Sequence, residues 1–140
     1  MSGDRLLDVV EDLRKKCLAK EEENCRILQL TETEYKGLLS LGNEERITCR
    51  EFSLRMNLSV SRGSRIIERL HAKGYLDRAD SCSDRRRKYV YLTPKGAAVR
   101  NKIDAQRQLC EKILVSAYSE AKLKKLKKEL LDLTEKFEKL

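Results

Sequence analysis

Two short stretches in the middle of this 140-residue chain carry basic side chains. The first, residues 58–70, begins Leu-Ser-Val-Ser and carries three arginines. The second, residues 84–88, reads Asp-Arg-Arg-Arg-Lys. Guanidinium and ammonium groups pair with phosphate, and the planar guanidinium also matches the O6 and N7 acceptors of guanine in the major groove of DNA. The two stretches therefore predict a surface that binds a nucleic acid.

The charge of the whole chain is unevenly distributed. Residues 50–88 hold 11 Lys and Arg against 5 Asp and Glu, whereas residues 1–34 hold 6 against 9, in a chain of net charge +8. A polyanion is attracted to such a region because each phosphate that is neutralised releases counterions. A generally basic soluble protein is the plainer alternative. The coincidence of the charge excess with the two basic stretches favours the polyanion partner.

Helix signals place the first stretch in a helix-turn-helix. Thr48 and Glu51 have the spacing of a capping box, which predicts a short helix over 49–56. After a tight turn, Ser59 is the predicted N-cap of a second helix, and Gly74 has the position of its C-terminal glycine. Two capped helices separated by a short turn are typical of a helix-turn-helix.

The second stretch falls in a predicted β-hairpin. Residues 75–78 and 88–92 have the composition of strands, and the second of them alternates polar and apolar residues. The segment 79–87 between them is polar and strongly basic at its end, as expected of a charged hairpin tip. Thr93 and Pro94 then begin a long helix as its N-cap and first helical residue.

Helices with apolar stripes are predicted on both sides of this region. The first covers residues 4–24, and a capping box that begins at Thr31 opens the next over 32–41. From Gly96 onward the chain is predicted to be helical with one break at 116–119, and its last part carries leucines in heptad-type steps. Such stripes need a partner helix, so we expect a homodimer formed by the chain ends.

The predicted fold is mainly α with a small β-hairpin wing, a winged helix-turn-helix with N- and C-terminal dimerisation helices. We expect a dimerisation helix at 1–30, a DNA-binding domain at 31–96 and dimerisation helices at 97–140. No apolar run approaches the ~18 residues of a membrane span, and the acidic N-terminus differs from a signal peptide. These features predict a cytoplasmic protein. We expect no enzyme, since one histidine and no phosphate-binding glycine loop are present.

Three runs of residues in this region form a recognisable pattern. They are Thr48-x-x-Glu51-Phe52-x5-Leu58-Ser59-Val60-Ser61, Arg65-Ile66-Ile67-Glu68-Arg69-Leu70-x-x-Lys73-Gly74-Tyr75-Leu76-x-Arg78, and Asp84-Arg85-Arg86-Arg87-Lys88-x-Val90-x-Leu92-Thr93-Pro94-Lys95-Gly96. The pattern resembles the MarR family of winged helix-turn-helix transcriptional regulators. The resemblance implies a repressor that binds a pseudo-palindromic operator as a homodimer. It also implies that the affinity for DNA is modulated by a small-molecule effector, a metal or oxidation.

The predicted DNA contacts lie at the start of the second helix and on the wing. They are Thr48, Ser59, Ser61, Arg62, Ser64, Arg65, Arg69, Arg85, Arg86, Arg87 and Lys88. The helix contacts are expected in the major groove, where Gly63 would let the backbone approach closely. Arg86 matches the wing arginine of the family and is expected to enter the minor groove. Asp84 is expected to orient Arg86, and the neighbouring basic residues are expected to contact phosphates. Any one of these arginines taken alone is equally well explained as a solvated surface charge.

The cysteines leave three interpretations open. Cys17 and Cys25 are eight residues apart, which places them about 80° apart around one helix. Cys110 lies on the C-terminal apolar seam. These three thiols would form a redox switch, or a thiolate metal site with Glu21–Glu23 nearby. Alternatively, Cys17 and Cys110 are buried small apolar residues and Cys25 is incidental. No cofactor is assigned with certainty.

A second function remains as an alternative to the regulator. A winged helix can also serve as a protein-interaction module or a non-specific nucleic-acid-binding module without a regulatory ligand. That alternative predicts weak DNA binding with no preference for sequence.

Overall fold

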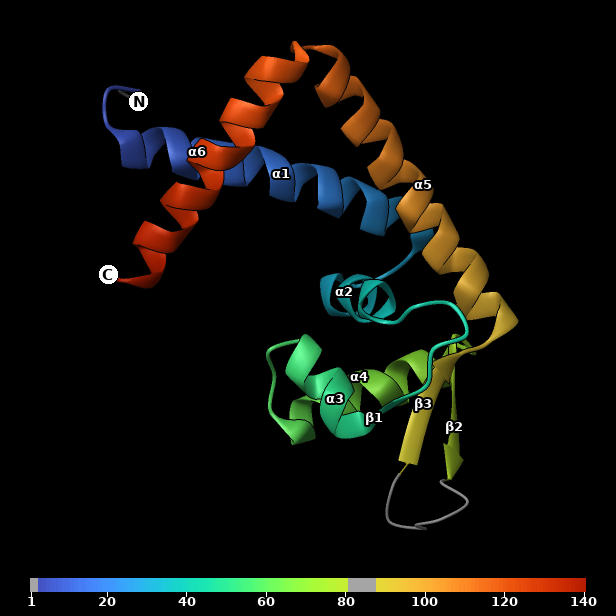
Figure 1. The fold of residues 1–140 in the computed structure, drawn as a ribbon. Coiled ribbons are helices and arrows are strands. Elements are labelled where there is room, and N and C mark those ends of the chain that lie inside the picture. The colour runs from blue at the N-terminus through green and yellow to red at the C-terminus, as the bar shows by residue number, and fades with distance from the viewer. Residues whose placement is uncertain (1–2, 81–87) are drawn as a thin grey trace. The chain divides into compact units, whose positions relative to one another are not determined.

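The computed structural model describes residues 3–80 and 88–140. The described residues form six α-helices and a three-stranded sheet (Figure 1). The helices are α1 (Leu6–Leu28), α2 (Glu32–Ser40), α3 (Cys49–Arg55), α4 (Val60–Ala72), α5 (Pro94–Ser116) and α6 (Glu120–Glu138). The strands are β1 (Ile47–Thr48), β2 (Leu76–Asp80) and β3 (Lys88–Leu92). The chain divides into two compact units, residues 1–104 and 105–140.

The predicted helix-turn-helix is confirmed as α3 and α4. Thr48 is the N-cap of α3, and its hydroxyl accepts a hydrogen bond from the Glu51 backbone N–H at 3.0 Å. Ser59 is the N-cap of α4 and accepts from the Arg62 backbone N–H at 3.2 Å. Between the helices, Asn57 adopts a left-handed conformation with φ 55°, which an asparagine tolerates better than most residues. Side-chain caps therefore begin both helices, and Asn57 forms the turn between them.

The wing is a sheet of three strands, whereas two were predicted. The strands follow the order β1-β3-β2, and both pairings are antiparallel. Val90 of β3 lies opposite Arg78 of β2 on one side and Ile47 of β1 on the other. A strand of two residues has no periodicity of its own, so β1 has no sequence signal and exists through its pairing with β3.

The first helix ends later than predicted. A helix was expected over residues 4–24, and α1 continues past Asn24 to Leu28. Gln29 ends it in a left-handed conformation with φ 56°, and the Leu30 N–H donates to the Cys25 carbonyl at 2.9 Å. The charged run before residue 24 does not stop the helix, since lysine and glutamate are good helix formers when solvated.

The core of the first unit lies between α2, α3, α4 and the sheet. Its largest fully buried apolar side chains are Tyr35, Leu38, Leu41, Phe52, Ile67, Leu70, Leu76, Val90 and Ile103. α3 packs on α4, and α2 packs on both of them (Figure 1). The core thus decides which side of α4 remains exposed.

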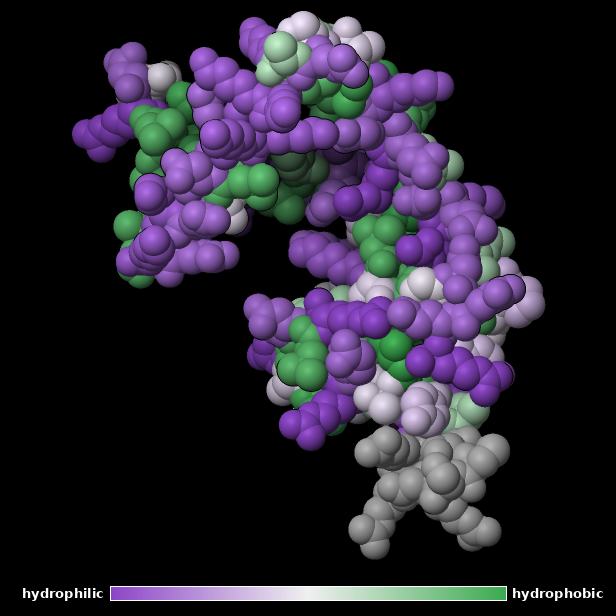
Figure 2. All heavy atoms as spheres, in the orientation of Figure 1, coloured by the Kyte–Doolittle hydropathy of each residue, from purple (hydrophilic) through white to green (hydrophobic). Residues whose placement is uncertain are grey.

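The second unit has no core of its own. All of residues 105–140 are described, and each of their side chains is exposed or half-exposed. The predicted break between α5 and α6 is confirmed at residues 117–119, where Ser119 caps α6 by accepting from the Lys122 N–H at 3.2 Å. In the face drawn in Figure 2, hydrophobic side chains reach the surface among predominantly hydrophilic ones.

None of the helices in the described ranges 3–80 and 88–140 combines the length and the hydrophobicity that crossing a membrane would require.

Candidate nucleic-acid interface

The face of α4 that points away from the core carries hydroxyl and guanidinium groups. Ile66, Ile67 and Leu70 are buried, and successive residues advance about 100° around a helix. The residues on the opposite side are therefore free to meet another molecule. The predicted contacts that are exposed there are Ser61, Arg62, Arg65 and Arg69, whereas Ser64 is half-buried.

The two capping hydroxyls lie at the starts of the paired helices. Thr48 and Ser59 each accept a hydrogen bond from a backbone N–H of their own helix. A hydroxyl that accepts one hydrogen bond still has its own proton to donate. Each predicted contact can therefore donate to a phosphate oxygen while it keeps its capping role.

Gly63 faces the interior of the protein. It is buried, and a Cβ added to it would lie 1.9 Å from Ser53 Oγ and 2.8 Å from Ser53 Cβ. The expectation that Gly63 lets the backbone approach DNA is therefore wrong. The glycine instead lets α4 cross closely over α3. Ser53 can sit there because its hydroxyl donates to the Cys49 carbonyl at 2.9 Å.

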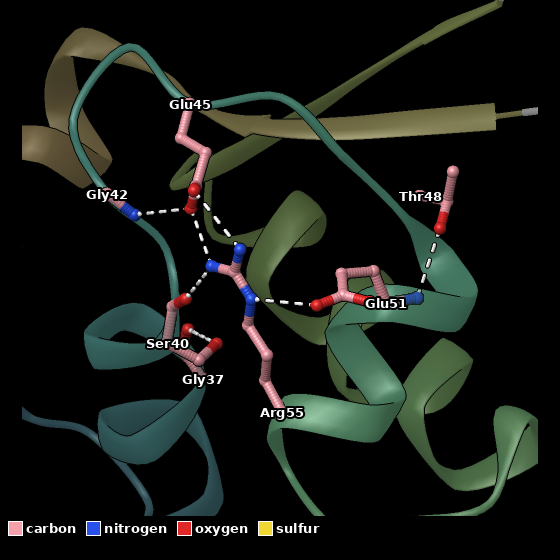
Figure 3. A network of polar contacts seen from close by, with 7 residues as sticks. All are labelled: Gly37, Ser40, Gly42, Glu45, Thr48, Glu51 and Arg55. Carbon is pink, nitrogen blue, oxygen red and sulfur yellow. Dashed lines mark hydrogen bonds and ion pairs between the residues drawn. The ribbon is translucent and has the colours of Figure 1, made fainter.

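An arginine on α3 connects this helix with the loop before β1 (Figure 3). The guanidinium of Arg55 contacts both carboxylate oxygens of Glu45, at 2.6 and 3.1 Å. It also donates to the Ser40 carbonyl at 2.8 Å and to Glu51 Oε1 at 3.4 Å. The predicted capping box at Thr48 is thus formed only in part, because the Glu51 side chain turns toward Arg55.

The pKa of Glu45 is lowered from 4.5 to about 2 by the hydrogen bonds from Arg55 and then from the Gly42 backbone N–H. A lowered pKa in the folded state stabilises the protein above the unfolded pKa, and this contribution is lost as the pH falls through the folded pKa. We expect Glu45→Gln to be less stable than the wild type at pH 7. The difference should shrink between about pH 4.5 and 2.

Urea unfolding of both proteins across this pH range measures the effect. Glu44→Gln, at the neighbouring exposed carboxylate, is the matched control and should differ little from the wild type at any pH. A stability difference between wild type and Glu45→Gln that stays constant down to pH 2 would contradict the role of the Arg55 pair.

The wing is described at its base. Lys88 is exposed at the start of β3 and lies opposite Asp80 of β2. The predicted contacts Arg85, Arg86 and Arg87, and Asp84 beside them, lie outside the described residues. Sequence reasoning did not single out Arg46, whose guanidinium lies 4.7 Å from the centre of the Tyr91 ring. A cation–π contact between residues so far apart in sequence has no local signal.

The cysteines differ in exposure, and the interpretation of buried Cys17 and Cys110 is wrong for the single chain. Both are exposed, whereas Cys25 is buried. Cys17 and Cys25 lie on one continuous helix, about 12 Å apart along its axis. The predicted metal site gains no support here, since residues 3–80 and 88–140 bring no three His, Cys, Asp or Glu side chains together around a cation. Control by thiols stays a prediction.

The surroundings of Cys25 disfavour its thiolate form. Burial, and then the negative charges of Glu21 and other nearby carboxylates, raise the pKa of its thiol. It lines a cavity of about 220 Å³ with Glu21, Glu22 and Glu32. Because the thiolate is the reactive form, oxidation at neutral pH is expected to be slow at Cys25.

The arrangement of α3, α4 and the sheet agrees with what comparison with known proteins finds. A model of the MarR family matches residues 30–88, which include the helix-turn-helix and most of the wing. This part of the chain is similar to the MarR family. Residues 30–88 contain α2, β1, α3, α4 and β2 and the first residue of β3.

Relatives of known name support the same assignment. The chain is 33% identical over 76 residues to the HTH-type transcriptional regulator TtmR of Methylorubrum extorquens, a match that covers 54% of this chain and 39% of TtmR. It is 33% identical over 72 residues to the multiple antibiotic resistance protein MarR of Salmonella typhimurium, covering 51% and 50%. The matches thus span half or less of these curated MarR relatives.

Solved structures share the fold over nearly the whole chain. FabT of Streptococcus pneumoniae in complex with DNA has a TM-score of 0.87 at 20% identity and covers 99% of each chain. Wild-type MarR of E. coli, in its apo form, has a TM-score of 0.73 at 22% identity, covering 95% of this chain and 98% of its own. The MarR-type winged helix, mainly α with a small sheet, is confirmed by these likenesses.

Proposed function

We propose that this protein is a DNA-binding transcriptional regulator that represses transcription from a pseudo-palindromic operator as a homodimer. The observation that carries the proposal is the exposed arginine face of α4, which lies opposite the side buried in the core. The major groove of B-DNA is about 12 Å wide and admits an α-helix. Guanidinium groups on the exposed face of such a helix can pair with guanine edges or phosphates. The proposal gives the protein no catalytic role.

The proposed dimer rests on apolar side chains that a single chain leaves exposed. α1 exposes Leu6 at 67%, Val9 at 53% and Leu13 at 52%. Apolar side chains are also exposed on α5 and α6, namely Leu109, Ile113, Leu114, Leu126, Leu130, Leu131 and Phe137. Large exposed apolar surfaces mark sites of protein association. We therefore propose that the N- and C-terminal helices, predicted at 1–30 and 97–140, form the interface.

A homodimer would present two copies of α4 to the DNA. Helix-turn-helix dimers bind half-sites that are about one helical turn, 34–36 Å, apart, and the symmetry of the operator mirrors that of the protein. The wing would follow the backbone beside each half-site, and Arg86 would reach the minor groove. Anything that changes the spacing of the two α4 helices would change the affinity. Effector, metal and thiol control would act on that spacing.

Selection of binding sites from random DNA tests the proposal. We expect the purified protein to enrich a pseudo-palindrome and to bind it as two chains per duplex. The ratio of affinities for specific and non-specific DNA should be at least about 10³. Light scattering of the free protein measures the oligomeric state. Weak enrichment without any symmetric consensus would contradict the proposal and favour the interaction or non-specific binding module.

A further inference from the structure

The C-terminal end of α4 is held by an ion pair with a buried carboxylate. Lys73 Nζ lies 2.6 Å from Glu34 Oε2 and 2.9 Å from Glu34 Oε1, and it donates to the Gln29 carbonyl at 3.1 Å. The side chain of Glu34 is 3% exposed and that of Lys73 is 39% exposed. Lys73 is the C-cap of α4. One ammonium group therefore joins the end of this helix to the end of α1 and the start of α2.

The carboxylate of Glu34 is fixed in place by its own helix. Oε1 accepts from the Thr31 N–H at 3.2 Å, and the Glu34 N–H donates to Thr31 Oγ1 at 3.2 Å. Burial opposes ionisation of Glu34, but hydrogen bonds from Lys73 and Thr31 outweigh it, so the pKa of the carboxyl is below its ordinary value. A buried charge that loses its partner is strongly unfavourable. The buried carboxylate is therefore stable in its ionised form only while Lys73 is paired with it.

The backbone that leaves α4 is also held from the other side. Lys95 Nζ donates to the Lys73 carbonyl at 3.1 Å. The Thr93 hydroxyl donates to the Gly74 carbonyl at 2.5 Å. Gly74 has φ 80°, a conformation that suits glycine, and turns the chain into β2. Contacts from α2 and from the start of α5 thus meet at Lys73 and Gly74.

We propose that Lys73 is a positioning residue for the DNA-facing side of α4 and that it does not contact DNA. A lysine directly after a recognition helix would ordinarily be assigned to a phosphate. Here its ammonium group is paired with the carboxylate of Glu34. This inference rests on the proposed DNA-binding function, because it concerns how the arginine face is held.

Two contacts near opposite ends of α4 set its angle. Gly63 lies against Ser53 near the N-terminus, and Lys73 lies against Glu34 at the C-terminus. A helix of 13 residues is about 20 Å long, so a tilt of about 5° around one end moves the other by about 2 Å. Binding groups must be held within about 0.5 Å of their productive positions. Loss of the Lys73 contact therefore lets α4 tilt about the Gly63 contact, which changes the direction in which its exposed arginines point.

The test compares Lys73→Met and Glu34→Gln with the wild type on a selected operator at several salt concentrations. We expect each change to lower the affinity about ten-fold. The slope of log K against log salt should fall by much less than the value of about 0.9 expected for one lost phosphate contact, because Lys73 itself makes no such contact. Arg69→Met, on the exposed face of the same helix, is the matched control and should lower the slope by about 0.9. Glu34→Gln keeps the size and shape of the side chain that caps the start of α2, so it still tests the proposal if Lys73→Met fails to fold.

Amide hydrogen exchange gives a second measurement that does not need DNA. The Gly74 N–H donates to His71 and the Tyr75 N–H to Leu70, each at 2.9 Å. Both amides should exchange faster in the two variants than in the wild type. Unchanged exchange rates would overturn the inference, as would unchanged affinity or a slope that falls by about 0.9 in Lys73→Met. If the wild type itself showed no preference for any sequence, the proposed function would fail instead.

Discussion

Gly63→Ala will destabilise the helix-turn-helix by about 1–3 kcal/mol, the cost of overpacking a well-packed contact. The new Cβ would lie 1.9 Å from Ser53 Oγ and 3.2 Å from Ser53 Cα. The hydroxyl can rotate away, but the backbone of α3 cannot, so the two helices must separate. Alanine would gain up to about 1 kcal/mol from helix propensity, and the clash outweighs this gain. Urea unfolding followed by circular dichroism measures the difference.

Gly37→Ala is the matched control for this prediction. Its added Cβ would meet only the ends of side chains, Leu70 and Phe52 at 3.2 Å and Ile66 at 3.4 Å. These groups can move by a few tenths of an ångström, so the stability should change by less than about 1 kcal/mol. In a Ser53→Gly background, Gly63→Ala should cost less than in the wild type. An equal cost in both backgrounds would show that Ser53 is not the obstacle.

Arg62→Ala and Arg65→Ala should each weaken binding to the selected operator by about 1–3 kcal/mol, which is roughly a five- to 150-fold loss. Both side chains are exposed on the side of α4 opposite Ile66, Ile67 and Leu70, so neither contributes to the core. The double variant should lose most of its preference for the operator over scrambled DNA. Titration of labelled duplexes at fixed salt measures both affinities.

Lys36→Ala removes an exposed cation from α2, outside the predicted DNA contacts and the proposed dimer helices, and is the control for net charge. Its loss should leave the ratio of operator to scrambled affinity unchanged. All three variants should unfold at the temperature of the wild type, because none of the changes creates a cavity. Full retention of sequence preference in the Arg62 and Arg65 variants would mean that α4 is not the reading helix.

Much of the DNA-binding half was predictable because its signals are local. The caps at Thr48, Ser59 and Thr93 each depend on a donor three residues away, and all three form as predicted. Gly74 has the left-handed conformation expected of a helix-ending glycine. The strands of the hairpin were recognisable from alternation over a few residues. Such short-range patterns are visible in a single sequence.

The errors arose where a contact joins distant parts of the chain. β1 exists only because Ile47 pairs with Val90, and Glu51 leaves its expected capping role because Arg55 is within reach. The thiols were assigned by their apolar character, but Cys17 is exposed and Cys25 is buried. Spacing shows which residues share a helix face; it does not show which face another element covers.

The sequence by itself determined the order of the helices, their caps, the winged helix-turn-helix and the arginines that α4 carries. Only the tertiary structure decided which side of α4 is exposed, that Gly63 faces α3, and that Lys73 is paired with Glu34. The physical reason is the separation in sequence between the residues that interact. Caps and helix faces depend on neighbours within one turn, whereas Lys73 and Glu34 are 39 residues apart and meet only once the core has formed.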